Sequence, residues 1–308
     1  MKRLLAAFLL LLVVALGALG WTFTAATLPV TEIDLQIPQA NPPPQMKLAV
    51  LHTGKMFSQA AFAYRGGPLG EERVFGMAAV LVQHPHGSLL IDSGFGRNVD
   101  QHVRTIPALM RATSRYAKET PAADQLARAG FDLAQLKGVV ITHAHWDHVS
   151  GLEDFPGVPV WLTQAEREFI GSGDRAAALA ASLGPRNYRV YGFADGPYLG
   201  YETSYDVFRD GSVVLVPAPG HTPGSIIAFV NTPDNKRYAF VGDLVWQREG
   251  VELPAERPWL SRRLVDHDEA GVRREVARLH RIAGRNPDLV VVPAHDRRVL
   301  DTLPAFGS

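Results

Sequence analysis

Short apolar runs separated by turn residues recur along the chain from residue 46 onward. Runs of this length, rich in Val, Ile and Leu and bounded by Gly, Pro, Asn or Asp, predict β-strands. We expect strands at 46–51, 74–82, 88–92, 138–141, 158–163, 213–216, 225–230, 237–241 and 289–292. The turn sequences His84-Pro85-His86-Gly87 and Pro233-Asp234-Asn235 indicate antiparallel hairpins.

Helical patterns lie between and after these strands. Residues 101–136 read as helical, with Thr120-Pro121 as the N-cap and first-turn pair of a second helix. Another helix is expected at 164–170, and Asp268 is expected to cap a helix that has Val272, Val276 and Leu279 on one face. The Gly-, Ala- and Tyr-rich segment before Asp206 permits no assignment. Strands in two groups, each followed by helices, predict an α/β domain with two sheets between helical layers.

The N-terminal segment has a different pattern. Lys2 and Arg3 precede an uncharged apolar block from Leu4 to Trp21. A basic start followed by such a block is typical of a secretory signal, and Ala18-Leu19-Gly20 offers small residues for cleavage. A retained membrane anchor is the alternative, because the block is just long enough to span a bilayer. Both interpretations place the remainder outside the cytoplasm, in the periplasm or the extracellular space.

Three regions follow from these patterns. Residues 1–26 form a signal peptide or membrane anchor, 27–45 form a Pro-rich linker, and 46–308 form one catalytic domain. Residues 37–44 (IPQANPPP) are expected to be a stiff, extended spacer within the linker.

Composition excludes several classes of protein. The 31 basic and 31 acidic side chains balance, and no Lys/Arg-dense block occurs, so we expect no nucleic-acid partner. The chain has no cysteine, which excludes disulfides, thiolate ligands and a lipoprotein anchor. Membrane contact is expected only through the N-terminal segment. The sequence leaves the oligomeric state open.

A cluster of metal-ligand residues follows one predicted strand. The segment 142–148 (THAHWDH) holds His143, His145, Asp147 and His148 directly after an apolar run. Imidazole nitrogen and carboxylate oxygen are the ligands of borderline metals such as zinc. Further candidates also stand where strands should end: His221, Asp243 and His295. Alone, a histidine at a strand end is usually structural, but next to this cluster the three become candidate ligands.

These elements, H-x-H-x-D-H at 143–148 followed by His221, Asp243 and His295, resemble the metallo-β-lactamase-fold hydrolases. The resemblance covers roughly residues 46–300 and implies a four-layer αββα sandwich. It places His143, His145 and His221 on one metal ion, places Asp147, His148 and His295 on a second, and makes Asp243 the bridge. Two divalent ions, most simply zinc, would then share a hydroxide that attacks the substrate, with Asp147 and Asp243 as the carboxylates nearest the reaction.

Asp92 follows another apolar run and has two interpretations. It could cap a turn, or, as the resemblance implies, it could accept the second N–H of a ligand imidazole. We favour the second interpretation.

The resemblance implies a small-molecule substrate, but its chemical class is predicted less directly than the metal ligands are. The order of the motifs is closest to that of the acyl-homoserine lactonases, so an ester or lactone is the first expectation. Those lactonases commonly have a Tyr three residues after the bridging Asp, whereas this chain has Trp246, whose indole cannot shuttle a proton. We expect Phe95, Trp246, the loop to Trp259 and five tyrosines between 188 and 205 to supply pocket walls. The tyrosines could instead pack under long loops. Arg248, Arg257, Arg262 and Arg263 could instead hold an anionic group.

Two other functions stay open at this point. One is a phosphotriesterase or another hydrolase of the same fold. The other is a metal-bound binding module with little turnover, because a fold alone does not determine function.

Overall fold

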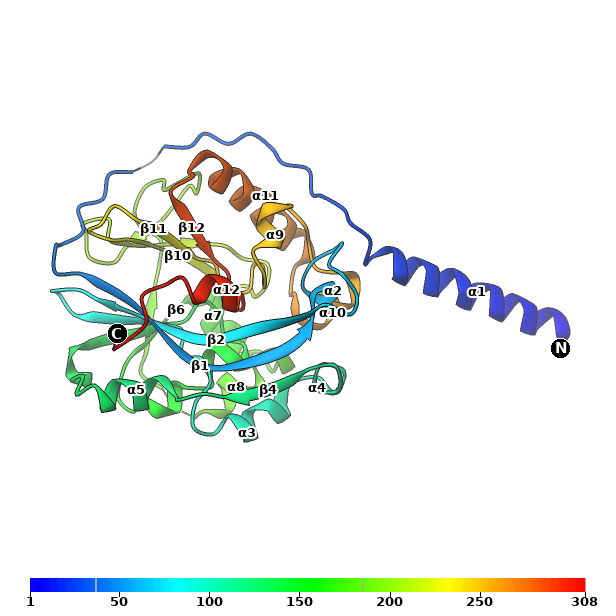
Figure 1. The fold of residues 1–308 in the computed structure, drawn as a ribbon, viewed down its shortest axis with the longest axis horizontal. Coiled ribbons are helices and arrows are strands. Elements are labelled where there is room, and N and C mark those ends of the chain that lie inside the picture. Colours follow the sequence, from blue (N-terminus) through cyan, green and yellow to red (C-terminus); the bar gives the residue numbers. More distant parts are fainter. Residues whose placement is uncertain (37, 185, 308) are drawn as a thin grey trace.

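Two β-sheets face each other, and helices cover the outer face of each (Figure 1). The computed structural model describes residues 1–36, 38–184 and 186–307. Ile37, which begins the expected spacer, and Ser308, which ends the expected domain, lie outside the described residues. Within these residues one sheet has the order β4-β1-β2-β3-β5-β6-β7 and the other has the order β12-β11-β10-β9-β8. The expected αββα sandwich is therefore confirmed.

The strands of the described part are short except for β1 and β2. They are β1 (Lys47–Gln59), β2 (Glu72–Gln83), β3 (Ser88–Ile91), β4 (Arg115–Lys118), β5 (Leu136–Val140), β6 (Val160–Thr163), β7 (Tyr188–Tyr191), β8 (Tyr205–Asp206), β9 (Val213–Pro217), β10 (Ile226–Asn231), β11 (Arg237–Phe240) and β12 (Leu289–Val292). The helices are α1 (Lys2–Trp21), α2 (Ala60–Ala63), α3 (Val99–His102), α4 (Ala108–Thr113), α5 (Ala122–Arg128), α6 (Trp146–Val149), α7 (Gln164–Gly171), α8 (Ala178–Ser182), α9 (Glu249–Glu252), α10 (Trp259–Val265), α11 (Glu269–Arg285) and α12 (Arg297–Leu300).

Both faces of the central strands are buried, which explains their continuous apolar runs. In β10, Ile226, Ala228 and Val230 pack between the two sheets. The alternate residues Ile227 and Phe229 pack beneath α11 on the outer face. Because side chains of a strand alternate between its faces, a strand covered on both sides must be apolar at every position.

Helix α11 forms as its sequence predicts. The Asp268 carboxylate accepts from the backbone N–H of Ala270 at 3.0 Å and caps the helix. Val272, Val276 and Leu279 are buried together against the second sheet. This apolar face holds α11 in the outer layer.

The expected helical stretch at 101–136 is partly wrong. Strand β4 interrupts it and pairs antiparallel with β1, so that Arg115 lies opposite Phe57. Helix α5 begins at Ala122 with Pro121 at its N-cap, and no side chain caps it. The local sequence of β4 is too short to specify a strand, and pairing with the long edge of β1 decides its conformation.

The expected linker does not separate α1 from the domain. Helix α1 projects from one end of the molecule, and the chain that follows it runs along the domain surface to β1 (Figure 1). The Leu28 N–H donates to the carbonyl of Pro254 at 2.8 Å, and the Asn41 N–H donates to that of Asp210 at 2.8 Å. The segment between α1 and β1 is thus held in place at several points.

Candidate metal centre

Strand ends from both sheets meet at one edge of the sandwich. His143 and His145 lie in the loop after β5, and short helix α6 carries Asp147 and His148. His221 follows β9, Asp243 follows β11 and His295 follows β12. All seven expected ligand residues therefore come together, and each of the three groups that these residues form has its potential ligand atoms within 4.8 Å of one another.

A close backbone approach makes room for this meeting. Gly242, just before Asp243, has φ 53°, and a Cβ there would lie 2.8 Å from Thr142 Oγ1. Only glycine combines this conformation with so little space. Gly242 thus lets the loop after β11 approach the loop that carries His143.

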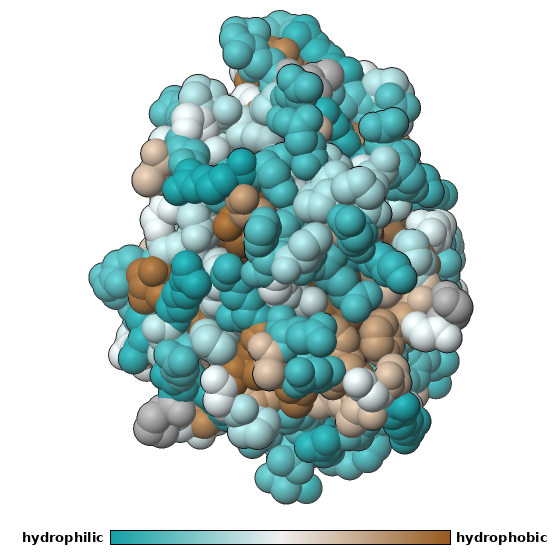
Figure 2. Space-filling model, turned by 90° about the vertical axis from the view of Figure 1, so that its left-hand side faces the viewer, coloured by the Kyte–Doolittle hydropathy of each residue, from teal (hydrophilic) through white to brown (hydrophobic). Residues whose placement is uncertain are grey.

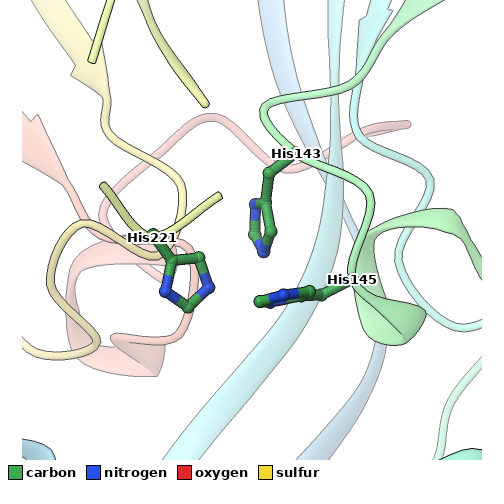
Figure 3. A group of neighbouring side chains, drawn as sticks. All are labelled: His143, His145 and His221. Carbon is green, nitrogen blue, oxygen red and sulfur yellow. The ribbon is translucent and has the colours of Figure 1, made fainter. Parts of the chain in front are cut away.

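The first group consists of His143, His145 and His221. Their rings point toward a common space, as Figure 3 shows, with ring centroids 4.5 to 4.6 Å apart. All three Nε2 atoms are buried and have no hydrogen-bond partner. Unpaired buried polar atoms are costly, and three converging on one point are the arrangement that a metal ion with imidazole ligands satisfies. The trio therefore fits a zinc-type ion.

The second group consists of Asp147, His148 and His295. His295 Nε2 lies 3.3 Å from Asp147 Oδ2 and 3.4 Å from His148 Nε2. Two imidazoles and a carboxylate oxygen at these separations offer three ligand atoms to a second cation.

Asp243 stands between the two groups. Its Oδ1 lies 2.9 Å from His295 Nε2 and 3.1 Å from His148 Nε2, on the side of the second group. Its Oδ2 lies 3.5 Å from His221 Nε2, on the side of the first. One carboxylate thus presents one oxygen to each group, which is the arrangement that a bridging ligand requires.

Burial and neighbouring charges shift the pKa values of these histidines in opposite directions. Burial, with the neighbouring imidazoles, lowers the pKa of His143 well below its usual range and that of His145 to about 3. Burial would also lower the pKa of His295, but the Asp243 carboxylate outweighs it and raises that pKa to about 10. His148 follows the same rule, because Asp92 and Asp243 outweigh burial and raise its pKa well above the usual range. Without metal, His143 and His145 are therefore neutral, and His148 and His295 carry positive charge beside Asp243 and Asp147.

Asp92 lies against a ligand residue. Its Oδ2 lies 2.8 Å from His148 Nδ1, and its two oxygens accept from the N–H and the hydroxyl of Thr142 at 2.7 and 2.8 Å. Asp92 has φ 55°, a left-handed conformation that costs energy in a residue other than glycine. These hydrogen bonds offset the strain and turn His148 Nε2 toward Asp243.

Two of the other expected ligand histidines, His221 and His295, have acceptors at Nδ1 as well. His221 Nδ1 lies 2.8 Å from Asp266 Oδ1, and His295 Nδ1 lies 3.0 Å from the carbonyl of Gly76. An acceptor at Nδ1 leaves the Nε2 lone pair free for a metal ion. Asp266 was not predicted from the sequence.

Of two further buried residues near the centre, Glu166 was missed and Arg257 was expected in a different role. The Glu166 carboxylate accepts from the N–H of Gly224 at 3.0 Å, from the Thr222 hydroxyl at 2.7 Å and from the Ala144 N–H at 2.5 Å. It therefore joins the loop of His143 and His145 to the loop of His221. Arg257 donates to the carbonyl of Asp243 at 2.8 Å and pairs with Asp266. Neither residue has a local sequence signal, because its partners are distant along the chain.

A cavity of about 690 Å³ opens beside the centre and reaches Asp147, Asp243 and His295. Its walls are largely apolar and come from β1, β2, α2, α4, α6 and α10. They include Met56, Phe62, Phe75, Met77, Ile106, Leu109, Met110, Trp146, Trp246, Leu260, Leu264 and Val265. Such a space suits an apolar substrate segment next to the reacting group.

Trp246 lines the cavity, as expected, and it also forms a hydrogen bond with Asp243 that was not expected. Its Nε1–H donates to Asp243 Oδ2 at 2.7 Å. The ring also packs edge-on against Phe75 at 5.9 Å. Trp246 therefore orients the bridging carboxylate rather than leaving its N–H for a substrate.

Phe95 and the tyrosines lie elsewhere. Phe95 is fully buried behind Trp146, with ring centroids 5.2 Å apart, and is not among the described residues that line the cavity. Tyr191 and Tyr205 stack beside the space between the sheets, and Tyr198 and Tyr201 pack against Phe229. Phe95 is thus part of the core of the first sheet and not a pocket wall. These four tyrosines also pack in the core, which was the alternative interpretation of the sequence.

Three of the four arginines point away from the cavity. Arg257 is bound behind Asp243, and Arg262 pairs with Glu256 at 2.8 Å. Arg248 is exposed beside Glu252. Arg263 alone of the four lines the cavity, with most of its side chain in solvent. A convergent cationic clamp is not present among the described residues.

Comparison with known proteins identifies the family. The model of the metallo-β-lactamase superfamily matches residues 74–295. The chain belongs to the metallo-β-lactamase superfamily. It is a metal-dependent hydrolase by this membership, which agrees with the clustered His and Asp side chains described above.

Relatives within the superfamily include lactonases. A probable metallo-hydrolase of Mycobacterium tuberculosis is 29% identical over 257 residues, which cover 74% of this chain and 78% of that protein. The N-acyl homoserine lactonase AttM of Rhizobium radiobacter is 27% identical over 229 residues, covering 70% and 80%. A solved N-acyl homoserine lactone hydrolase with N-hexanoyl-L-homoserine at its catalytic metal centre has a TM-score of 0.66 at 17% identity, covering 85% of this chain and 97% of that one.

Proposed function

We propose that this chain is a dinuclear hydrolase that cleaves an ester or lactone carrying an apolar acyl group. The observation that carries the proposal is the position of Asp243. One of its oxygens faces the unpaired Nε2 of His221, and the other faces His148 and His295. A carboxylate in this position can bind two cations at once, one with each oxygen.

Zinc fits this ligand set best. The donors are five imidazoles and two carboxylates, with no thiolate and few oxygens, which disfavours magnesium or calcium. Two bound zinc ions would supply a hydroxide nucleophile at neutral pH and polarise the substrate carbonyl.

The chain's own residues determine geometry and access. Asp92 and Asp266 hold the rings of His148 and His221 so that Nε2 of each faces the centre. Trp246 fixes the Asp243 carboxylate, and its ring together with Phe75 excludes water from one side of the cavity. An acyl chain can occupy the apolar space formed by α4 and α10 while its carbonyl reaches Asp147 and His295.

The apolar walls favour a neutral ester over a charged phosphodiester. Holding an anionic group bidentately requires buried, convergent arginines, and Arg257 and Arg262 are already paired with carboxylates. A low-turnover binding module is disfavoured because all seven expected ligand residues are present and converge.

The test combines metal analysis with a substrate panel. The zinc-loaded full chain is expected to hold two ions and to hydrolyse lactones and carboxylic esters faster than phosphotriesters, phosphodiesters or β-lactams. Asp243→Asn should lower both zinc occupancy and turnover, whereas Asp234→Asn, in the exposed turn before β11, should change neither. Full zinc occupancy together with phosphodiesterase activity alone would show that the substrate assignment is wrong.

A further inference from the structure

Helix α1 is connected to the domain by a segment with a defined path. Leu28, Ile33 and Leu35 pack against the apolar cluster of the second sheet, and Glu32 pairs with Arg281 at 2.7 Å. Arg237 donates to the carbonyl of Pro38 at 3.1 Å. Contacts at this many points oppose free swinging, so the end of α1 has a defined position on the domain.

The end of α1 lies at the rim of the cavity beside the candidate metal centre. Phe23 packs edge-on against Phe62 of α2, with ring centroids 5.9 Å apart, and Phe62 lines the cavity. Arg65, which is buried, donates to the carbonyls of Trp21 and Thr24 at 3.1 and 3.0 Å and lies over the Trp21 ring at 4.7 Å. Cleavage at residue 26 would remove both carbonyl acceptors and the Trp21 ring, and would leave Arg65 with Glu256, at 3.6 Å, as its remaining ion partner. The contacts therefore favour retention of at least Trp21 to Ala25.

Helix α1 itself has the properties of a membrane span. It is 20 residues long with a mean hydropathy of 2.6, and none of its residues is buried. At 1.5 Å per residue it is about 30 Å long, the thickness of a bilayer hydrocarbon core. Lys2 and Arg3 lie at its outer end, and Trp21, 65% exposed, lies at its inner end, where membrane proteins place interfacial tryptophans.

Exposed apolar side chains lie on elements at the end of the molecule from which α1 leaves. Helices α2, α4 and α10 lie at this end of the molecule (Figure 1). Leu69, in the loop after α2, is 76% exposed, Leu109 of α4 is 45% exposed, and Trp259 of α10 is 44% exposed. The opposite end, which Figure 2 shows, is mostly hydrophilic, with one larger apolar area in its lower half. Three exposed apolar side chains therefore belong to the elements beside which a bilayer around α1 would lie.

We propose that α1 is retained as a membrane anchor, and that Leu69, Leu109 and Trp259 dock the cavity rim on the bilayer surface. The substrate would then be an amphiphile, an ester or lactone with a long acyl chain, that enters the cavity from the lipid. Docking of the rim on the bilayer depends only on α1 and the exposed apolar side chains, whereas the substrate class rests on the proposed hydrolase function.

Docking can be tested by site-directed spin labelling, because the chain has no native cysteine. The full chain is reconstituted in phosphatidylcholine–phosphatidylglycerol vesicles with a nitroxide at Leu69→Cys or, as a matched control, at Leu133→Cys. Leu133 is also an exposed leucine but precedes β5, far along the chain from the rim. We expect membrane-dissolved oxygen to relax the label at 69 more than a water-soluble nickel complex does, and the reverse at 133. Equal, water-like behaviour at both positions would overturn the docking proposal, as would an intact mass showing that the cell removes α1.

Substrate delivery is tested with two esters. Leu69→Asp should raise the apparent KM for a long-chain ester embedded in vesicles by about tenfold, because it places a charge against the lipid, and should leave kcat/KM for a short, water-soluble ester unchanged. Leu133→Asp should change neither. Equal effects of Leu69→Asp on both esters would contradict delivery from the bilayer. Absence of turnover for every ester would instead refute the hydrolase assignment and leave the labelling result standing.

Discussion

Replacing Trp246 by Phe tests whether the Trp246 indole sets the bridging carboxylate. The substitution removes the N–H that donates to Asp243 Oδ2 at 2.7 Å and keeps an aromatic ring beside Phe75. Both partners are buried, at 9% and 5% exposure, so water cannot replace the lost donor easily. A buried hydrogen bond to a charged group contributes about 1.5–3 kcal/mol. We therefore expect zinc affinity to fall by about ten- to a hundredfold, the range measured when partners of metal ligands are removed.

The assay is competition with a chelator of known zinc affinity, together with steady-state kinetics on a lactone or ester. Weaker zinc binding should appear as a lower kcat at limiting zinc, restored in part by excess zinc. The matched control is Trp146→Phe, since Trp146 also lines the cavity but packs against Phe95 rather than against a ligand residue. Equal zinc affinity in the two variants would refute the reasoning, because loss of indole volume alone would then account for the result.

Three further results are expected. Loading the metal-free chain at pH 7 should release about three protons. Two come from His148 and His295, whose pKa values are raised, and one comes from the water that becomes the hydroxide. His143 and His145, whose pKa values are lowered, release none. Calorimetry in buffers of different ionisation enthalpy measures this number, and release of no protons would contradict the assigned charge states. Burial raises the pKa of Glu166 from 4.5 to about 7, so this carboxyl ionises at a lower pH in the unfolded chain than in the folded one. As the pH rises from 4.5 to 7, the metal-free protein should therefore lose about 3 kcal/mol of folding stability relative to the Glu166→Gln variant. Urea unfolding at both pH values checks this, and parallel pH profiles would argue against it. Asp266→Asn should lower zinc affinity, because Asp266 contacts His221 Nδ1, whereas the control Asp268→Asn removes only the cap of α11 and should lower it less. A chelator titration that ranks the two variants in reverse would contradict the role of Asp266.

The sequence predicted the parts of this molecule that depend on local pattern. His143, His145, His221 and His295 each follow an apolar run, and strand ends in a layered α/β fold meet at one edge. Their convergence could therefore be expected before the structure was known. Helix α11 was also predictable, because Asp268 and the apolar face behind it lie within a few turns of each other.

Features that depend on distant partners could not be predicted in this way. Asp266 and Glu166 look like ordinary surface acids, and only the fold places them beside His221 and the Ala144 N–H. Strand β4 exists because β1 offers an unpaired edge. Aromatic composition alone does not tell a pocket wall from core, which is why Phe95 was assigned to the wrong place.

The most direct test of the central claim is a crystal structure of the zinc-loaded chain with anomalous data at the zinc edge. Two anomalous peaks are expected, about 3.5–4 Å apart. One should lie about 2.0–2.1 Å from the Nε2 atoms of His143, His145 and His221, and the other should lie at similar distances from His148 and His295, with the Asp243 carboxylate between them. A single peak, or two peaks with Asp243 bound to only one of them, would contradict the claim that this residue joins two metal sites.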